Sequence, residues 1–426
     1  MATTVAETAA REHGTAAGTR DGFLDVVRTV ALMRVILLHL FSFTVISYFV
    51  AAMPAMFFVS GSLYARSVDR RGARVVLADR LHRILVPFWL FGATALMVML
   101  GAAVHSPGAN TDLHWWQAIS WTVPVVYPMG SKWQTGWLAA PLWYVSVLLW
   151  LFVLGPLLLR AVRRRPGLCF AILIGALFLL GGPVRDGAPP RVMALGALAN
   201  LVLYTTMFML GFLHHDGRFA RFDFRARLGA CAVFAAGAAA WCTVQPVPYN
   251  EVNFSAPAEL LVGLAWLSLA FAFEAVIARV PRTRGIGPFV TWTTQRAMTV
   301  YLWHAAAIIL AYQLLWKLDW SLPWGAFVAL LVALTVGFIA CFTVVFGWAE
   351  DLGARRRVRV WPTTRGAVPS PRPARRLRPA FAVCASVGVI AFVASSLTVN
   401  SARGWHRDRT LMGPDSTEAH AAKWRH

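Results

Sequence analysis

Long apolar runs recur along most of the chain, and short polar segments separate them. A run of about twenty apolar residues is long enough to cross the hydrocarbon core of a bilayer as an α-helix. The pattern predicts eleven spans, at 29–46, 48–65, 84–104, 139–159, 168–183, 193–213, 228–245, 257–278, 297–316, 322–347 and 379–398. The predicted fold is therefore all-α, a polytopic integral membrane bundle of about eleven transmembrane helices, ten in the core and one near the C-terminus.

The polar segments divide the chain into five parts. We predict a disordered tail at 1–22, a membrane domain at 23–348, an Arg/Pro-rich cytoplasmic linker at 349–378, an eleventh transmembrane helix at 379–398 and a tail at 399–426. No apolar core with a small-residue cleavage site follows the first tail, so the first span is expected to be a retained anchor.

The connections between spans alternate in basic charge. The segments 66–83, 160–165, 214–227, 279–296 and 350–378 hold 27 basic residues, whereas 105–138, 184–192, 246–256 and 317–321 hold four. By the positive-inside rule the first set is cytoplasmic. We therefore expect a multi-pass plasma-membrane protein with its N-terminus inside and its C-terminus outside. The segment 105–138 holds five tryptophans, which favours an interfacial belt or a re-entrant lid.

Composition supports the membrane assignment. Hydrophobic residues make up 58% of the chain and the mean hydropathy is +0.59. The net charge of +21 does not indicate nucleic-acid binding, because the basic residues lie in short connections between apolar runs. The five cysteines fall singly in or beside apolar segments, so no metal site or redox pair is predicted.

The first span carries charge where a lipid-facing helix has none. Arg28 and His39 are eleven residues apart, which places them on one helix face and about 16 Å apart along the axis. Arg34 is a third charged residue within this span. An ionisable group at mid-depth indicates a functional site unless it only bonds a neighbouring helix.

Three further elements carry candidate chemistry. Arg80 and Arg83 are expected to point the same way from one helix end, where two guanidinium groups suit a phosphorylated ligand. His304 lies at a depth comparable to that of His39, so both histidines are expected to border one cavity. Ser60-Gly61 lacks the context of an activated nucleophile, and close helix packing explains it better. Positive-inside orientation alone also accounts for paired arginines at a helix end.

Together these elements resemble the membrane acyltransferase 3 family over about residues 20–348. The motifs that carry the resemblance are Asp25-x-x-Arg28 with ten residues before His39, Phe57-Phe-x-Ser60-Gly61, Arg80-x-x-Arg83 followed by Pro87, Leu142-Trp143-Tyr144 and Tyr301-Leu-x-His304.

The resemblance implies transfer of an acyl group, often acetyl from acetyl-CoA, to a hydroxyl of a carbohydrate, lipid or natural product. It implies that His39 is catalytic and that Arg28, Arg80 and Arg83 bind the acyl-CoA donor. We predict His39 as general base, with His304 as a second catalytic residue. No serine or cysteine lies in an activated context, so direct attack is favoured over a covalent intermediate, although an acyl-histidine relay remains an alternative.

The remaining site predictions concern the acceptor and Arg34. We predict that Trp143, Tyr144 and Ser60 contact the substrate. The family pattern does not require Arg34, and we group it with the arginines predicted to bind the donor. Alternatively, Arg34 pairs with a carboxylate or is characteristic of a subgroup of the family. The expected partners are the lipid bilayer, acyl-CoA and a hydroxyl-bearing acceptor.

A function of another class is a transporter or flippase that relays protons or anions through His39 and Arg34. Broken helices in paired positions would favour it, and the sequence shows no such pair. A purely structural scaffold does not explain two histidines and an arginine inside the membrane.

Overall fold

The computed structural model describes residues 21–105, 115–124, 138–181, 190–245, 247, 251–318 and 322–359. Every regular element in these parts is helical, which confirms the predicted all-α class. The helices of at least eight residues are α2 (Gly22–Phe41), α4 (Ala52–Arg71), α5 (Ala73–His105), α6 (Trp115–Thr122), α8 (Trp143–Arg164), α9 (Pro166–Leu180), α10 (Pro190–His215), α11 (Phe224–Val244), α12 (Ala256–Ala272), α14 (Ile286–Gln295), α15 (Ala297–Leu318) and α16 (Trp324–Gly353). Short helices connect them, at α3 (Ile46–Phe49), η2 (Ala140–Leu142), η4 (Val252–Phe254), α13 (Glu274–Ile277) and η5 (Val280–Arg282).

Seven of the described helices are long and apolar enough to cross a membrane, and eight if the bent pair Ala256–Ala272 and Glu274–Arg282 forms one span. The chain is thus a multi-pass membrane protein. α2 has sufficient length but carries three charged residues, Asp25, Arg28 and Arg34. α9 is apolar and has 15 residues. The predicted eleventh span and both tails lie outside the described residues, apart from 21–22.

Most helix bounds differ by a few residues from the sequence prediction, and the predicted span 257–278 is bent by 71° between Ala256–Ala272 and Glu274–Arg282. Two further differences concern the basic segments. The arginine-rich connection 66–83 is almost entirely helical. α4 ends at Arg71, Gly72 with φ +80° separates the two helices, and α5 begins at Ala73. A glycine is suited to this backbone conformation because it has no Cβ. At the other end of the domain, α16 continues beyond the predicted limit of 348 to Gly353. Basic side chains on these helical extensions are therefore held on rigid backbone.

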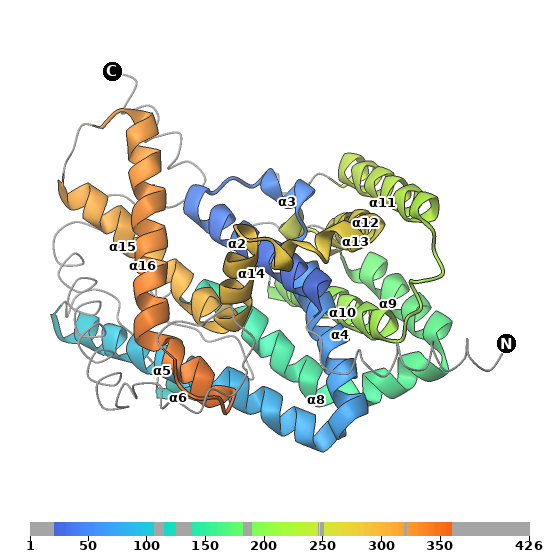
Figure 1. Ribbon diagram of the computed structural model, residues 1–426, viewed down its shortest axis with the longest axis horizontal. Coiled ribbons are helices and arrows are strands. Elements are labelled where there is room, and N and C mark those ends of the chain that lie inside the picture. The colour runs from blue at the N-terminus through green and yellow to red at the C-terminus, as the bar shows by residue number, and fades with distance from the viewer. Residues whose placement is uncertain are drawn as a thin grey trace.

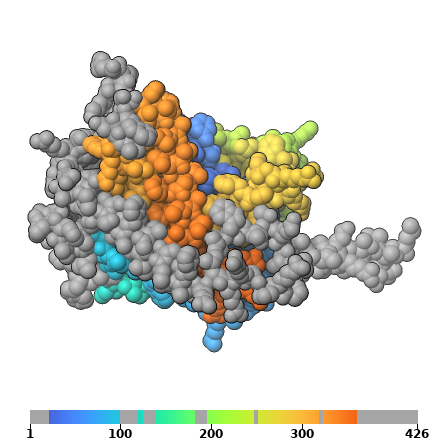
Figure 2. All heavy atoms as spheres, turned by 60° about the vertical axis from the view of Figure 1, so that its left-hand side comes forward, coloured from blue at the N-terminus to red at the C-terminus, as the bar shows by residue number. Residues whose placement is uncertain are grey.

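α2 lies near the middle of the molecule, with α15 and α16 on one side and α11 and α12 on the other (Figure 1). It packs against α4, α14 and α15. Most of its apolar side chains are buried, and so is Arg34. Seen from the side of α16, that long helix runs across the face of the molecule beside the first helices of the chain (Figure 2). The charged helix of the sequence is thus the central helix of the fold.

Glycines bring α4 and α10 into close contact. A Cβ atom on Gly61 would lie 2.0 Å from the carbonyl oxygen of Phe208, and one on Gly211 would lie 2.2 Å from that of Phe58. Neither position has room for a methyl group, so the two backbones pack directly on each other. The packing interpretation of Ser60-Gly61 therefore holds for Gly61.

Polar contacts join segments that the charge pattern places on the same side. At the arginine-rich end, Arg163 on α8 binds Asp69 on α4 and Asp216 after α10. At the other end, Ser47 accepts a hydrogen bond from the backbone N–H of Val252. The basic ends of these helices thus lie at the same end of the bundle, together with the arginines described below.

Candidate active site

The site is built around two histidines on different helices. His39 lies in the last turn of α2, and His304 lies in the second turn of α15 and is fully buried. His39 Nδ1 and His304 Nε2 are 2.7 Å apart. The ring planes lie within 8° of parallel with centroids 5.0 Å apart. Because the two nitrogens are closer than stacked faces allow, the rings meet edge to edge through a hydrogen bond.

A backbone carbonyl fixes the direction of this hydrogen bond. His304 Nδ1 lies 2.6 Å from the carbonyl oxygen of Tyr301, and a carbonyl can only accept, so Nδ1 carries the proton. In a neutral His304, Nε2 then accepts the Nδ1–H of His39. His39 is left with an unprotonated Nε2, which makes no hydrogen bond within the described part of the chain. This nitrogen is available to take a proton from a ligand.

A cavity of about 410 Å³ adjoins His39. Its walls come from α2, the start of α4 at Met53, residues 141–143 before and at the start of α8, residues 196–204 of α10, the segment 251–256 and Tyr301 on α15. Three of these walls border the connections 105–138, 184–192 and 246–256, which the charge pattern assigns to the extracytoplasmic side. His39 therefore borders a cavity that is also lined by residues next to these arginine-poor connections.

The cavity has a polar wall centred on Arg34. Arg34 is only 3% exposed, and its Nη2 donates to Asn253 Oδ1 at 3.3 Å. Its Nε is buried and has no hydrogen-bond partner among the described residues. Glu251, which accepts from Asn253 Nδ2 at 2.5 Å, also lines the cavity. A buried guanidinium with a free donor loses free energy unless a ligand oxygen satisfies it.

A second carboxylate lies behind this wall. Glu259 on α12 is buried and accepts a hydrogen bond from the Tyr204 hydroxyl at 3.1 Å, while its Oε1 has no partner. Glu259 and Glu251 both attract the Arg34 guanidinium electrostatically, although neither lies within ion-pairing distance in the described residues. Burial raises the pKa of the Glu251 carboxyl, which its hydrogen bond with Asn253 and the Arg34 charge partly offset.

The predicted substrate-contacting residues fall on two sides of an aromatic wall. Trp143 lines the cavity, as does Tyr301. Tyr144 is buried behind them, 5.1 Å from the Tyr301 ring by centroids, and it hydrogen-bonds with Ser60. Of the three predicted residues, Trp143 is thus placed on the cavity surface, whereas Tyr144 and Ser60 lie between the cavity and the arginines.

Three of the four predicted donor-binding arginines gather at the arginine-rich end. Arg80 interacts electrostatically with both Arg28 and Arg83, and Arg28 and Arg80 both influence Tyr144. The expectation that Arg80 and Arg83 point the same way is wrong. Arg80 turns towards α4, where it donates to the Leu63 carbonyl and to Ser67 Oγ, both at 3.1 Å, whereas Arg83 is exposed beside α16.

The structure separates Arg34 from the other arginines. Its neighbours are Glu251, Asn253 and Glu259 on the cavity side. Sequence reasoning did not identify Glu251, Asn253 or Tyr204 as site residues. The signal that could have identified this segment as part of a site is the pair of polar residues Glu251 and Asn253, two positions apart between apolar stretches.

The described helices form a polytopic bundle in which a hydrogen-bonded histidine pair adjoins a polar cavity, an arrangement that can support general-base chemistry. A sequence model of the acyltransferase domain of the acyltransferase 3 family matches residues 21–344. The chain belongs to this family and is a membrane acyltransferase. Neither a curated protein nor a solved structure matches it significantly.

Proposed function

We propose that this protein transfers an acyl group, with acetyl as the first candidate, from an acyl-CoA thioester to a hydroxyl of an acceptor. The observation that carries the proposal is the hydrogen-bonded series from His39 through His304 to the Tyr301 carbonyl, which leaves a basic nitrogen next to the cavity. A neutral imidazole in this arrangement suits general-base catalysis on an alcohol.

His39 Nε2 takes the proton of the acceptor hydroxyl as its oxygen attacks the thioester carbonyl carbon. The resulting imidazolium is stabilised by His304, because Nδ1–H of His39 donates to His304 Nε2. When the tetrahedral intermediate collapses, the new C–O bond remains and the C–S bond breaks. His39 then returns its proton to the departing thiolate, which restores the neutral pair.

The donor is proposed to approach from the arginine-rich end. Arg28, Arg80 and Arg83 supply guanidinium groups there, and Tyr144 and Ser60 lie between them and the histidines. Guanidinium groups bind phosphate oxygens through paired hydrogen bonds, and the coenzyme is rich in phosphate. On the charge pattern this end is cytoplasmic, where acyl-CoA is present.

The acceptor is proposed to occupy the 410 Å³ cavity. Arg34 Nε offers a free donor, Glu251 offers acceptor oxygens and Trp143 offers an apolar aromatic surface. This combination suits a ligand that both donates and accepts hydrogen bonds, such as a polyhydroxylated acceptor. We therefore reassign Arg34 from the donor to the acceptor.

The test is acyl transfer by purified protein in nanodiscs, with acetyl-CoA and a cell-envelope extract as acceptor source. His39→Ala is expected to lower turnover by at least about 10²-fold, because general-base catalysis contributes this much. His214→Ala is the matched control, since it also removes a buried histidine, one that hydrogen-bonds Ser62 at 2.9 Å at the arginine-rich end of α10. Equal turnover in wild type and His39→Ala would reject the proposal, and transport without thioester cleavage would favour the transporter alternative.

A further inference from the structure

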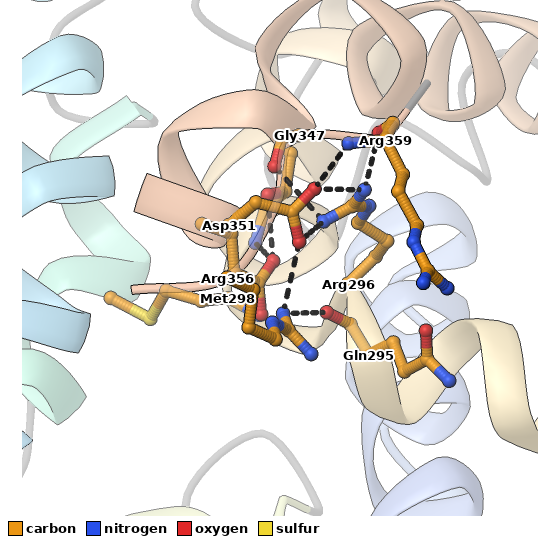
Figure 3. Close-up of polar contacts among 9 residues, drawn as sticks. Gln295, Arg296, Met298, Gly347, Asp351, Arg356 and Arg359 are labelled. Carbon is orange, nitrogen blue, oxygen red and sulfur yellow. Dashed lines mark hydrogen bonds and ion pairs between the residues drawn. The ribbon is translucent and has the colours of Figure 1, made fainter. Parts of the chain in front are cut away.

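The chain beyond α16 is fixed against the bundle by a buried ion pair. Arg296, 1% exposed, binds Asp351 through two hydrogen bonds of 2.8 Å. The same guanidinium donates to the carbonyls of Gly347 and Arg359 (Figure 3). Asp351 also binds Arg356 at 3.2 Å. Residues up to Arg359 are therefore held in place after the helix has ended.

The same region packs directly on the start of α5. A Cβ atom on Gly353 would lie 3.2 Å from the Cα of Arg83, so the two backbones touch. The Gly353 carbonyl lies 2.9 Å from Nδ1 of His82. The end of α16 is thus adjacent to the donor-binding arginines.

Arg355 has an unfavourable backbone conformation at this junction. Its φ is +52°, in the left-handed region, and it follows the last turn of α16. Helices commonly end with this conformation, but the residue is usually glycine because a Cβ is strained there. An arginine is uncommon at such a position, which makes its side chain a candidate for a binding function.

Four guanidinium groups, those of Arg71, Arg83, Arg355 and Arg356, lie close together here with two carboxylates, Asp79 and Asp351. Arg71 and Arg355 both pair with Asp79, the second at 3.7 Å. Arg83 is close enough to Arg71 and Arg356 to be repelled by both. The carboxylate that pairs with Arg356, Asp351, also pairs with Arg296. The surface formed by Arg71, Arg83, Arg355 and Arg356, hereafter the arginine surface, therefore carries a surplus of positive charge.

We propose that Arg355 and Arg356 complete a phosphate-binding site with Arg71 and Arg83, and that this site holds the phosphates of a soluble, multiply phosphorylated ligand. Arg355 and Arg356 both lie beyond the residues that the family model matches, 21–344. The ligand neutralises the repulsion among the four groups and accepts their paired hydrogen bonds.

Rigid positioning favours a soluble polyphosphate over a lipid headgroup. Attraction to anionic lipid needs only net basic charge near the surface and no fixed geometry. Here Arg356 is anchored by Asp351 and by the Gln295 carbonyl, and Arg355 is held in a strained conformation. Arg80 interacts electrostatically with Arg83 and Arg71 of this surface and with Tyr144 in the interior. The inference thus rests on the proposed function for the identity of the donor, while phosphate binding itself is independent of it.

The test measures binding of coenzyme A and of inorganic pyrophosphate to the full-length protein in neutral phosphatidylcholine nanodiscs. Arg355→Gly is the decisive variant, because glycine relieves the left-handed strain while the charge is removed. We expect the dissociation constant for both probes to rise about threefold to tenfold, with Tm unchanged or higher. Arg355→Lys should recover part of the affinity. Arg357→Ala is the control, because Arg357 is exposed and makes no hydrogen bond or ion pair among the described residues. The affinity of this variant for both probes should stay within about twofold of the wild-type value.

A second variant, Arg356→Gln, should also weaken the binding of both coenzyme A and pyrophosphate. Unchanged binding of both probes to Arg355→Gly and Arg356→Gln would overturn the proposal. So would an effect seen only in nanodiscs with phosphatidylglycerol, because the surface would then bind lipid headgroups. If His39→Ala loses acyl transfer but still binds pyrophosphate, the phosphate-binding site is supported independently of the catalytic role of His39. If the arginine variants bind pyrophosphate normally while His39 remains essential, the phosphate-binding site is rejected and the proposed acyl transfer is not.

Discussion

The imidazoles of His39 and His304 share a hydrogen bond of 2.7 Å although 265 residues separate them in sequence. The bond crosses from α2 to α15 and is oriented by the Tyr301 carbonyl. His304 therefore fixes both the tautomer and the orientation of His39. Such a residue acts through another and is a positioning residue for the proposed transfer.

Replacement of His304 is expected to reduce kcat less than replacement of His39. In His304→Ala, His39 loses the acceptor for its Nδ1–H, so either tautomer becomes accessible and the imidazolium is less stabilised. We expect kcat to fall by about tenfold to hundredfold, which is at or below the lower limit of the roughly 10²–10⁴-fold that a general base itself contributes. The pH profile of kcat should shift as well. A fall in kcat with an unaltered pH profile would indicate a purely structural role.

Arg34 and Arg80 should affect different substrates. Arg34→Gln removes the guanidinium from the cavity wall and should raise the acceptor KM, leaving the donor KM within about twofold. A ligand bond to a charged group contributes about 1.5–3 kcal/mol, or roughly tenfold to hundredfold in KM. Arg80→Gln should show the reverse pattern. Titration of each substrate at saturation with the other measures the effect, and a donor defect in Arg34→Gln would restore the sequence-based assignment.

Acceptor binding should weaken on mild acidification. Burial raises the pKa of the Glu251 carboxyl, so this group becomes protonated at a higher pH than an ordinary glutamate. As the pH falls, the carboxylate of the cavity wall is lost and the acceptor KM should rise. Glu251→Gln has no charge to lose and should show a higher but flatter KM over the same range. The same pH dependence in both proteins would exclude Glu251 as its source.

The Arg296–Asp351 pair should contribute strongly to stability. Asp351→Asn leaves Arg296 buried with its charge unpaired, which costs about 3–5 kcal/mol. Asp69→Asn is the matched control, because Asp69 and its partner Arg163 are 39% and 35% exposed and such pairs contribute about 0–1 kcal/mol. Denaturation of the detergent-solubilised variants measures both. A Tm for Asp351→Asn equal to that of the control would show that the pair is not a structural clamp.

The proposed sides of the membrane can be tested by cysteine labelling. With the native cysteines replaced, Arg70→Cys and Thr135→Cys should react with an impermeant thiol reagent from the inside and the outside, respectively. Arg70 lies at the arginine-rich end of α4, and Thr135 lies outside the described residues in the connection 105–138. Labelling of both from one side would break the orientation on which the donor and acceptor assignments depend.

The order of the helices, the basic ends and the residues worth testing follow from the sequence alone. Helical periodicity places Arg28 and His39 on one face, and run length sets the depth of His304. These properties are local, since each depends on neighbours within a few turns. The family motifs add His39, Arg80 and Arg83 as candidates by the same local pattern.

Tertiary structure alone decided which of these residues meet. Periodicity gives the direction of a side chain from its own helix but not which helix lies opposite. The divergence of Arg80 and Arg83 depends on where α4 and α16 pack against α5. Likewise, Arg34 is assigned to the cavity because the segment 251–256 folds over α2 and brings Asn253 to it. Long-range packing, which no stretch of sequence encodes locally, brought His39 and His304 together and separated Arg34 from Arg28, Arg80 and Arg83.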